Sequence, residues 1–210
     1  MNISALLQLV FIVAVGLLLS ILVHESGHAL ACRLVGFRIL GVSLPYVAVN
    51  RTNTFWKVTW STALGLSGSV RSLPLAGRNL RLRLFLTTSA GPCASILSGA
   101  FCAWVVRSHD STLPTILTGG VSATALFSLL LGSLALVPRQ TRMGISDGLW
   151  MWTALIGGSE TDRTLSQWLL WGSSVSGLRP REWNPDLVEK ALSGQPTPIS
   201  RWLEYNLARR

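Results

Sequence analysis

The chain has 210 residues, of which 49% are hydrophobic and only 13% are charged, and its formal net charge is +9. Soluble domains carry about 25% charged residues, so this composition excludes an ordinary soluble protein. The positive charge lies between and after the apolar runs, and we interpret it as a sign of membrane orientation and contact with anionic lipid rather than of nucleic-acid binding.

Three long apolar runs account for much of the chain. Residues 3–23, 84–106 and 111–138 contain no Asp, Glu, Lys, Arg or His. Each run reaches the roughly 20 residues that a helix needs to cross a hydrocarbon layer about 30 Å thick. Because only helices and closed barrels span lipid, and these runs show no period of two, they predict three transmembrane helices.

The first run predicts a helix over about residues 5–34. Residues 37–82 then change character, because β-branched and aromatic residues are broken by Asn and Gly, a pattern that predicts strands and hairpins. We expect a small β element there, on the cytoplasmic side of the membrane. The second and third runs predict helices over about 82–107 and 113–137, the third of which is stopped by Pro138.

The apolar stretches that follow the third run are shorter. Residues 147–158 are too few to span a membrane, so they predict a partial helix against the bundle or a helix at the interface. Residues 163–176 predict another interfacial helix, and two short helical stretches follow. We therefore expect an intramembrane domain over residues 1–158 and a cytoplasmic or interfacial C-terminal segment over residues 159–210.

The basic residues are distributed unevenly about the predicted helices. Eight lie between the first and second runs, whereas the turn at 107–112 holds only Arg107. Because cytoplasmic loops are rich in Lys and Arg, the N-terminus and this turn are predicted to lie outside, and residues 33–83 and everything after 138 inside. This predicts a multi-pass protein of the cell membrane.

All three predicted helices carry rows of small or polar residues at every fourth position, which let membrane helices approach closely. The rows are Gly16, Ser20, His24 and His28 in the first helix, Gly91, Ser95 and Gly99 in the second, and Gly120, Thr124, Ser128 and Gly132 in the third.

The sequence His24-Glu25-Ser26-Gly27-His28 carries the clearest chemical signal. Residues four apart lie on one face of a helix, so both imidazoles can bind one metal. A catalytic zinc uses three protein ligands and leaves one position open for water, and Glu25 is placed to take a proton from that water. Ionisable residues in a membrane helix are costly and mark functional sites, so we assign a catalytic zinc site here.

The residues alone leave several candidates for the third ligand. His109 is the only other histidine, but it is predicted at the opposite side of the membrane. Among the carboxylates on the inner side, Asp147 follows the third helix most closely, and Glu160 and Asp162 compete with it.

These residues resemble the site-2 protease family of intramembrane zinc metalloproteases, peptidase family M50. The resemblance covers residues 15–155 through three elements in the expected order: His24-Glu25-x-x-His28, then Ala90-Gly91-Pro92, and finally a helix ending at Pro138 followed by Ser146-Asp147-Gly148. It implies that His24, His28 and Asp147 bind Zn²⁺ and that Glu25 activates water.

The chain departs from the family pattern in the residues that handle substrate. The family often has Asn where this chain has Ser95 and Ala135, and those asparagines are thought to bind the substrate backbone. Ser95 and Ser133 are the candidates to take their place. The interval between Pro138 and Asp147 is also longer than in the commonest form.

We therefore predict a zinc-dependent intramembrane endopeptidase: an α-helical integral membrane protein that hydrolyses a peptide bond of a membrane-associated protein. Its partners are the lipid bilayer and a membrane protein or peptide substrate, with no nucleic acid. An alternative is a non-proteolytic zinc-binding partner of a transporter or signalling complex, which the missing asparagines favour and the intact Glu25 disfavours. A helical scaffold without metal is the third hypothesis.

Overall fold

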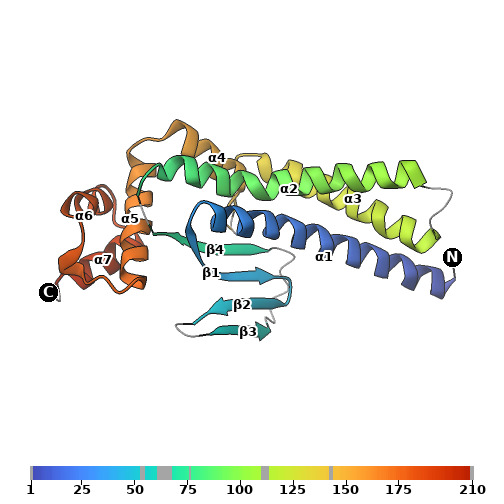
Figure 1. The fold of residues 1–210 in the computed structure, drawn as a ribbon, viewed down its shortest axis with the longest axis horizontal. Helices are drawn as coiled ribbons and strands as arrows, with labels where there is room; N and C mark the ends of the chain where they lie inside the picture. The colour runs from blue at the N-terminus through green and yellow to red at the C-terminus, as the bar shows by residue number, and fades with distance from the viewer. Residues whose placement is uncertain are drawn as a thin grey trace.

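Three long helices run side by side along the longest axis of the molecule (Figure 1). The computed structural model describes residues 2–52, 55–60, 68–75, 77–109, 114–141 and 144–208. The helices are α1 (Ile3–Leu34), α2 (Leu80–His109) and α3 (Thr115–Leu136), and each is long and apolar enough to cross a membrane. The three predicted helices are thus present, with α1 and α2 each starting two residues earlier than expected. Part of the predicted turn at 107–112 lies outside the described residues.

The ends of α1 follow from local sequence. The Asn2 side chain caps its first turn by accepting a hydrogen bond from the Ala5 backbone N–H at 2.9 Å. At the other end Gly36 adopts a φ of +75°, a left-handed conformation that suits glycine and turns the chain into the sheet. Leucines along the N-terminal half of α1, including Leu6 and Leu7, are exposed, as expected of a surface that faces lipid.

Small residues lie where the helices touch. A Cβ on Gly16 would overlap α3 at Ala123, one on Gly27 would overlap the α2 backbone at Ala90, and one on Gly132 would overlap α2 at Pro92. Gly120 does not take part, because nothing lies within 4 Å of the position its Cβ would occupy. The rows of small residues therefore pack the bundle, with Gly120 as an exception.

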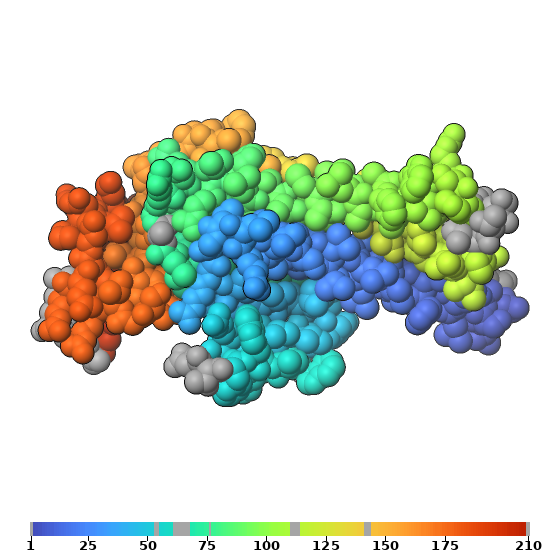
Figure 2. Space-filling view, viewed as in Figure 1, coloured from blue at the N-terminus to red at the C-terminus, as the bar shows by residue number. Residues whose placement is uncertain are grey.

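A four-stranded antiparallel sheet lies beside α1 and projects from the side of the bundle (Figures 1 and 2). Its strands are β1 (Phe37–Leu44), β2 (Val47–Arg51), β3 (Trp56–Trp60) and β4 (Ser69–Pro74), in the order β3-β2-β1-β4. The predicted β element is therefore present. Two further strands of two residues each, β5 (Gln140–Thr141) and β6 (Gly144–Ile145), pair with each other antiparallel after α3.

The two faces of the four-stranded sheet differ in chemistry. Strand pairing places one polar row across all four strands, consisting of Arg71, Gly41, Asn50 and Lys57. The adjacent row on the opposite face consists of Val70, Val42, Val49 and Val58. Because successive side chains of a strand point to opposite faces, the sheet has one polar and one apolar face.

The remaining helices lie at the end of the bundle opposite the N-terminus (Figure 1). They are α4 (Asp147–Ile156), α5 (Ser159–Val175), a 3₁₀ turn (Pro180–Glu182), α6 (Pro185–Leu192) and α7 (Pro198–Ala208). The α4 helix is the short apolar segment predicted after the third run, and α5 starts four residues before the predicted interfacial helix.

Two apolar clusters join these elements. One connects the end of α1, the start of β1 and α2, and helices α4 and α5; its buried members are Cys32, Phe37, Leu80, Leu84, Ala154, Leu165 and Leu169. The other holds α5, α6 and α7 together around Leu170, Trp183, Ala191 and Leu203. The first cluster ties the sheet and α4 to the bundle and so holds the cleft described below.

Candidate metal centre and cleft

The α1 helix places two imidazoles one above the other. His24 and His28 are one turn apart, their ring centroids are 4.9 Å apart, and their Nε2 atoms are 3.2 Å apart. This is the arrangement expected for residues at positions i and i+4 of a helix. Both side chains line the same cleft.

The N-terminus of α4 brings a carboxylate to the same point. Asp147 Oδ2 lies 3.2 Å from His24 Nε2 and 3.3 Å from His28 Nε2. The helix starts there because the Ser146 side chain accepts a hydrogen bond from the Leu149 N–H. Gly148 lets α4 approach the end of α3, because a Cβ at that position would overlap the Leu136 carbonyl.

Hydrogen bonds on the far side of each ring orient the two histidines. His28 Nδ1 lies 2.7 Å from the Thr87 carbonyl oxygen, and because a carbonyl can only accept, this nitrogen carries the hydrogen. His24 Nδ1 lies 2.9 Å from Ser95 Oγ. A neutral imidazole with its hydrogen on Nδ1 has a lone pair at Nε2, so His28 Nε2 is available as a metal ligand. Ser95 Oγ can accept a hydrogen from His24 Nδ1, and this tautomer leaves the same lone pair on His24 Nε2.

The donor set fits a zinc ion. Two imidazole nitrogens and one carboxylate oxygen are the ligands of many catalytic zinc sites. Ligands about 2.0–2.1 Å from a tetrahedral zinc lie about 3.3 Å from one another, and the three separations here are 3.2, 3.2 and 3.3 Å. Three acceptor atoms so close together repel one another unless positive charge lies between them, which a divalent cation supplies.

Asp147 is suited to serve as an ionised ligand. Burial raises its pKa, but the contacts of the carboxylate with the neighbouring His24 and His28 outweigh burial and lower the pKa to about 2. The carboxylate is therefore charged at neutral pH.

Glu25 lies beside these three residues and has an unusual environment. Its side chain is buried, and within the described part of the chain its Oε2 atom makes no hydrogen bond. It is close enough to interact electrostatically with His24, His28 and Asp147. Gly68, which directly precedes β4, makes room for it, because a Cβ there would overlap the Glu25 carboxylate. A buried carboxylate oxygen without a partner is rare and needs an explanation, and its position beside His24, His28 and Asp147 is compatible with a catalytic role.

A cleft of about 1010 Å³ opens from these residues. Its walls come from α1, α2 and α3, from the β4 edge and polar face of the sheet, and from the segment after α3, including α4 and α5. Aromatic residues line part of it, among them Phe37, Tyr46, Trp150 and Trp168. The cleft is large enough to take several residues of a peptide beside the clustered histidines and carboxylates.

Comparison with known proteins bears on this site. The family model described as Peptidase M50B-like matches residues 2–195, which include His24, Glu25, His28 and Asp147. The chain belongs to the Peptidase M50B-like family. The resemblance to peptidase family M50 is thereby confirmed, and membership suggests a peptidase. No curated protein and no solved structure matches the chain.

In this M50B-like protein the other residues considered as third ligand, Glu160, Asp162 and His109, lie away from the two clustered histidines. Asp162 forms a two-oxygen ion pair with Arg81 at 2.6 and 2.7 Å, and Glu160 pairs with Arg163 at 2.5 Å. His109 is the last residue of α2, and its Nδ1 lies 3.3 Å from the Val105 carbonyl. Among the described residues, only His24, His28 and Asp147 form a group that could hold a metal.

The two serines predicted to bind substrate lie in different places. Ser95 is fully buried and contacts His24, and Ser133 lies on an exposed part of α3. Neither lines the cleft, whereas Ala135, at the other position where the family often has Asn, does.

Thr87 and Gly68 also support the site of this family member, and neither was predicted. Thr87 acts through its backbone carbonyl, which leaves no mark in the sequence. Gly68 is close to Glu25 only because β4 folds back beside α1.

Proposed function

We propose that the protein is a zinc-dependent intramembrane endopeptidase that cleaves a membrane-associated protein. The observation that carries the proposal is the spacing of His24 Nε2, His28 Nε2 and Asp147 Oδ2, 3.2–3.3 Å apart, beside a buried Glu25 oxygen without a hydrogen-bond partner. A structural zinc needs four protein ligands and no base, whereas three ligands and a base are the elements of a hydrolase.

His24, His28 and Asp147 would hold the zinc, with Ser95 and Thr87 orienting the imidazoles. When bound, zinc supplies Lewis-acid chemistry, since it polarises a carbonyl and lowers the pKa of water. Glu25 then accepts a proton from the attacking water and delivers it to the nitrogen of the departing amine, so that the peptide bond is replaced by a carboxylic acid and an amine. Burial of Glu25 keeps competing water away from the carboxylate.

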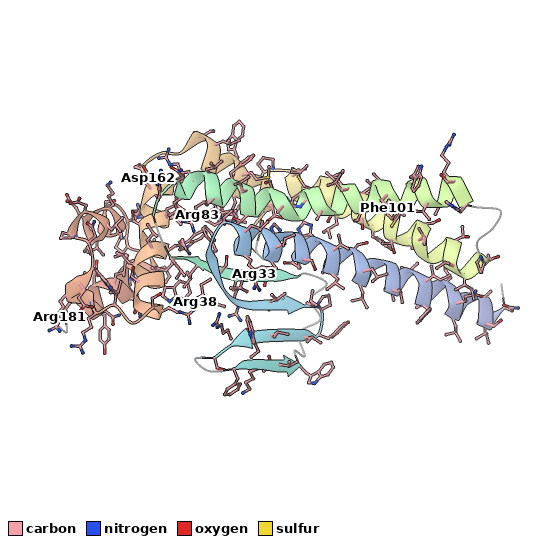
Figure 3. All side chains as sticks on the ribbon, in the orientation of Figure 1. Arg33, Arg38, Arg83, Phe101, Asp162 and Arg181 are labelled. Carbon is pink, nitrogen blue, oxygen red and sulfur yellow. The ribbon has the colours of Figure 1, made fainter. Side chains whose placement is uncertain are left out.

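The position in the membrane is part of the same proposal. With the N-terminus outside, the end of α1 that carries the histidines lies near the cytoplasmic face, and the sheet and helices α4–α7 lie on that side. Figure 3 supports this arrangement, because the labelled Arg33, Arg38 and Arg83 lie at the end of the bundle beside the sheet and the C-terminal helices, whereas Phe101 lies in the other half of α2. Arginines at one end are typical of the cytoplasmic side.

Metal content tests the site first. We expect about one zinc per chain in the detergent-purified protein, as the three-ligand site requires, and a large loss of zinc in His28→Ala and in Asp147→Ala. His109→Ala is the matched control, because it removes a histidine at the far end of α2 and should leave the zinc content unchanged. Absence of zinc from the wild-type protein under metal-replete conditions would overturn the proposal in favour of a helical scaffold.

Activity tests the role of Glu25. Glu25→Gln should keep the zinc and abolish cleavage of a membrane-protein substrate, because the amide cannot accept the proton. Cleavage at the wild-type rate by this variant would show that Glu25 is not the base. Zinc binding without cleavage of any substrate by the wild-type protein would favour the non-proteolytic alternative, a zinc-binding partner of another membrane protein.

A further inference from the structure

Four residues of the cleft, His24, Glu25, His28 and Asp147, form the candidate metal centre. Two arginines line the cleft in addition to them. Arg71 projects from β4, and Arg139 follows α3. Among the described residues that line the cleft, the only charged or titratable groups are these two, the metal-centre residues, Cys32 and Tyr46. The cleft outside the metal centre is therefore positively charged.

The position of Arg71 is set by its neighbours in the sheet. It lies in the polar row of the sheet, directly opposite Gly41, which in turn is opposite Asn50. Its Nη2 donates a hydrogen bond to Asn50 Oδ1 across the position that a Gly41 side chain would fill. A Cβ on Gly41 would lie 2.6 Å from Asn50 Oδ1 and 3.0 Å from Arg71 Nη2. Glycine at position 41 thus leaves the space in which this guanidinium is held.

Arg139 lies on a different wall and close to the metal centre. Its backbone N–H donates to Ser146 Oγ at 2.9 Å, and its carbonyl accepts from the Ser146 N–H at 3.0 Å. Ser146 directly precedes Asp147. Within the part of the chain that the structure describes, no hydrogen bond or ion pair engages the Arg139 guanidinium, which leaves its donors free for a ligand.

The part of the chain that forms the sheet side of the cleft carries positive charges and no negative ones. Residues 26–109, which include all four strands of the sheet, contain no Asp or Glu. A basic wall with no acidic residue of its own attracts acidic groups and repels basic ones. Arginine in addition binds a carboxylate through two parallel hydrogen bonds.

We propose that Arg71 and Arg139 recognise the substrate, and that the substrate carries an acidic side chain within a few residues of the bond that is cut. This inference rests on the proposed peptidase function, which it deepens by naming a substrate class. Arg71 is three residues along β4 from Gly68, which touches Glu25, so it lies roughly 10 Å from the reacting groups, a distance that an extended peptide covers in about three residues.

A binding experiment tests the proposal separately from catalysis. The probes are fluorescent apolar peptides with an amidated C-terminus, each with a single Glu at one position, and twins with Gln at that position. They are titrated into zinc-loaded Glu25→Gln protein in a zwitterionic detergent. At the best position we expect the Glu peptide to bind about five-fold more tightly than its twin, as an exposed ion pair allows.

Charge reversal identifies the residues responsible. In the same background, Arg71→Glu and Arg139→Glu should each reduce the preference for Glu, and the double variant should prefer a Lys peptide. Arg51→Glu is the matched control, because Arg51 is an exposed arginine of the same sheet that packs over the Trp56 ring and does not line the cleft. Arg71→Gln, together with a circular-dichroism melt, separates loss of the charge from loss of the fold.

The outcomes are distinct. Equal binding of the Glu and Gln peptides at every position would overturn the proposal. A preference for Glu that survives in the double variant would overturn it as well. Failure of the peptidase function would instead be seen as absence of zinc or of cleavage in the wild-type protein, whatever the peptides do.

Discussion

At the scale of single residues, Gly91 shows how closely the bundle encloses the candidate metal centre. A Cβ at this position would overlap the His28 imidazole. Gly91→Ala should therefore displace His28 and weaken zinc binding about 10–100-fold, as loss of ligand orientation does, although no ligand is removed. The measurement is a competitive zinc titration with a chromogenic chelator.

Gly120→Ala is the matched control for this prediction. It makes the same substitution in a neighbouring helix where nothing lies within 4 Å of the new Cβ. It should bind zinc as the wild type does and unfold at the same temperature or higher, because Ala favours helix over Gly. Equal zinc affinity in Gly91→Ala and Gly120→Ala would show that the contact with His28 is not needed.

Ser95 is predicted to orient a ligand. Its hydroxyl contacts His24 Nδ1 at 2.9 Å in a fully buried position, so Ser95→Ala should lower zinc affinity about 10–100-fold, as removal of such supporting groups does. Ser98→Ala is the control, because that hydroxyl bonds to a carbonyl of its own helix. If Ser95→Ala weakened peptide binding and left zinc affinity unchanged, Ser95 would serve the substrate, as the sequence suggested.

The sequence predicts the contacts between residues that are close along the chain, but not those between residues on different helices. His24, Glu25 and His28 are adjacent on one helix, so helical geometry alone places the two imidazoles together. The contact between Ser95 and His24 depends on how α1 and α2 rotate against each other, which no local pattern specifies. Asp147 was reached through its position after the third helix and through the family resemblance.

At the scale of elements, the junction of α3 and α4 holds Asp147 in place. Gly148 packs against the Leu136 carbonyl with no space for a side chain. Gly148→Ala should push α4 away, destabilise the protein by about 1–3 kcal/mol and lower its zinc content. A thermal melt and a metal assay check this.

A second substitution in α4 serves for comparison. Leu155 is 64% exposed on the same helix. Leu155→Ala should change stability by less than about 0.5 kcal/mol and leave the zinc content unchanged. A similar loss of zinc in both variants would mean that α4 as a whole, and not the contact at Gly148, holds Asp147.

The elements themselves were largely predictable, and their pairing was not. Twenty consecutive apolar residues specify a spanning helix with little dependence on context, so α1, α2 and α3 follow from hydropathy. The residues of the sheet were identified by their β-branched and aromatic content. The pairing of β1 with β4, across about 30 residues of chain, has no local signal, and the edge of β4 beside Glu25 could not be foreseen.

At the scale of the whole molecule, the proposed orientation predicts which residues a reagent can reach from outside the cell. In a background without the native cysteines, Ser108→Cys at the end of α2 should react with an impermeant maleimide in intact cells. Gln195→Cys, between α6 and α7, should react only after lysis. Both positions are exposed, so the difference depends on the membrane and not on burial. The reverse pattern would place the metal centre near the outer face.

The three proposed ligand atoms come from distant parts of the chain, since Asp147 follows His24 by 123 residues. During synthesis the histidines enter the membrane in α1, long before the residue that completes their site exists. A chain that stops short of α4, or in which α3 fails to insert, holds an incomplete site that binds zinc weakly. Under the proposed function, metal occupancy therefore reports that all three long helices and α4 have reached their places, and a nascent or misassembled chain cannot act as a protease among the other proteins of the membrane.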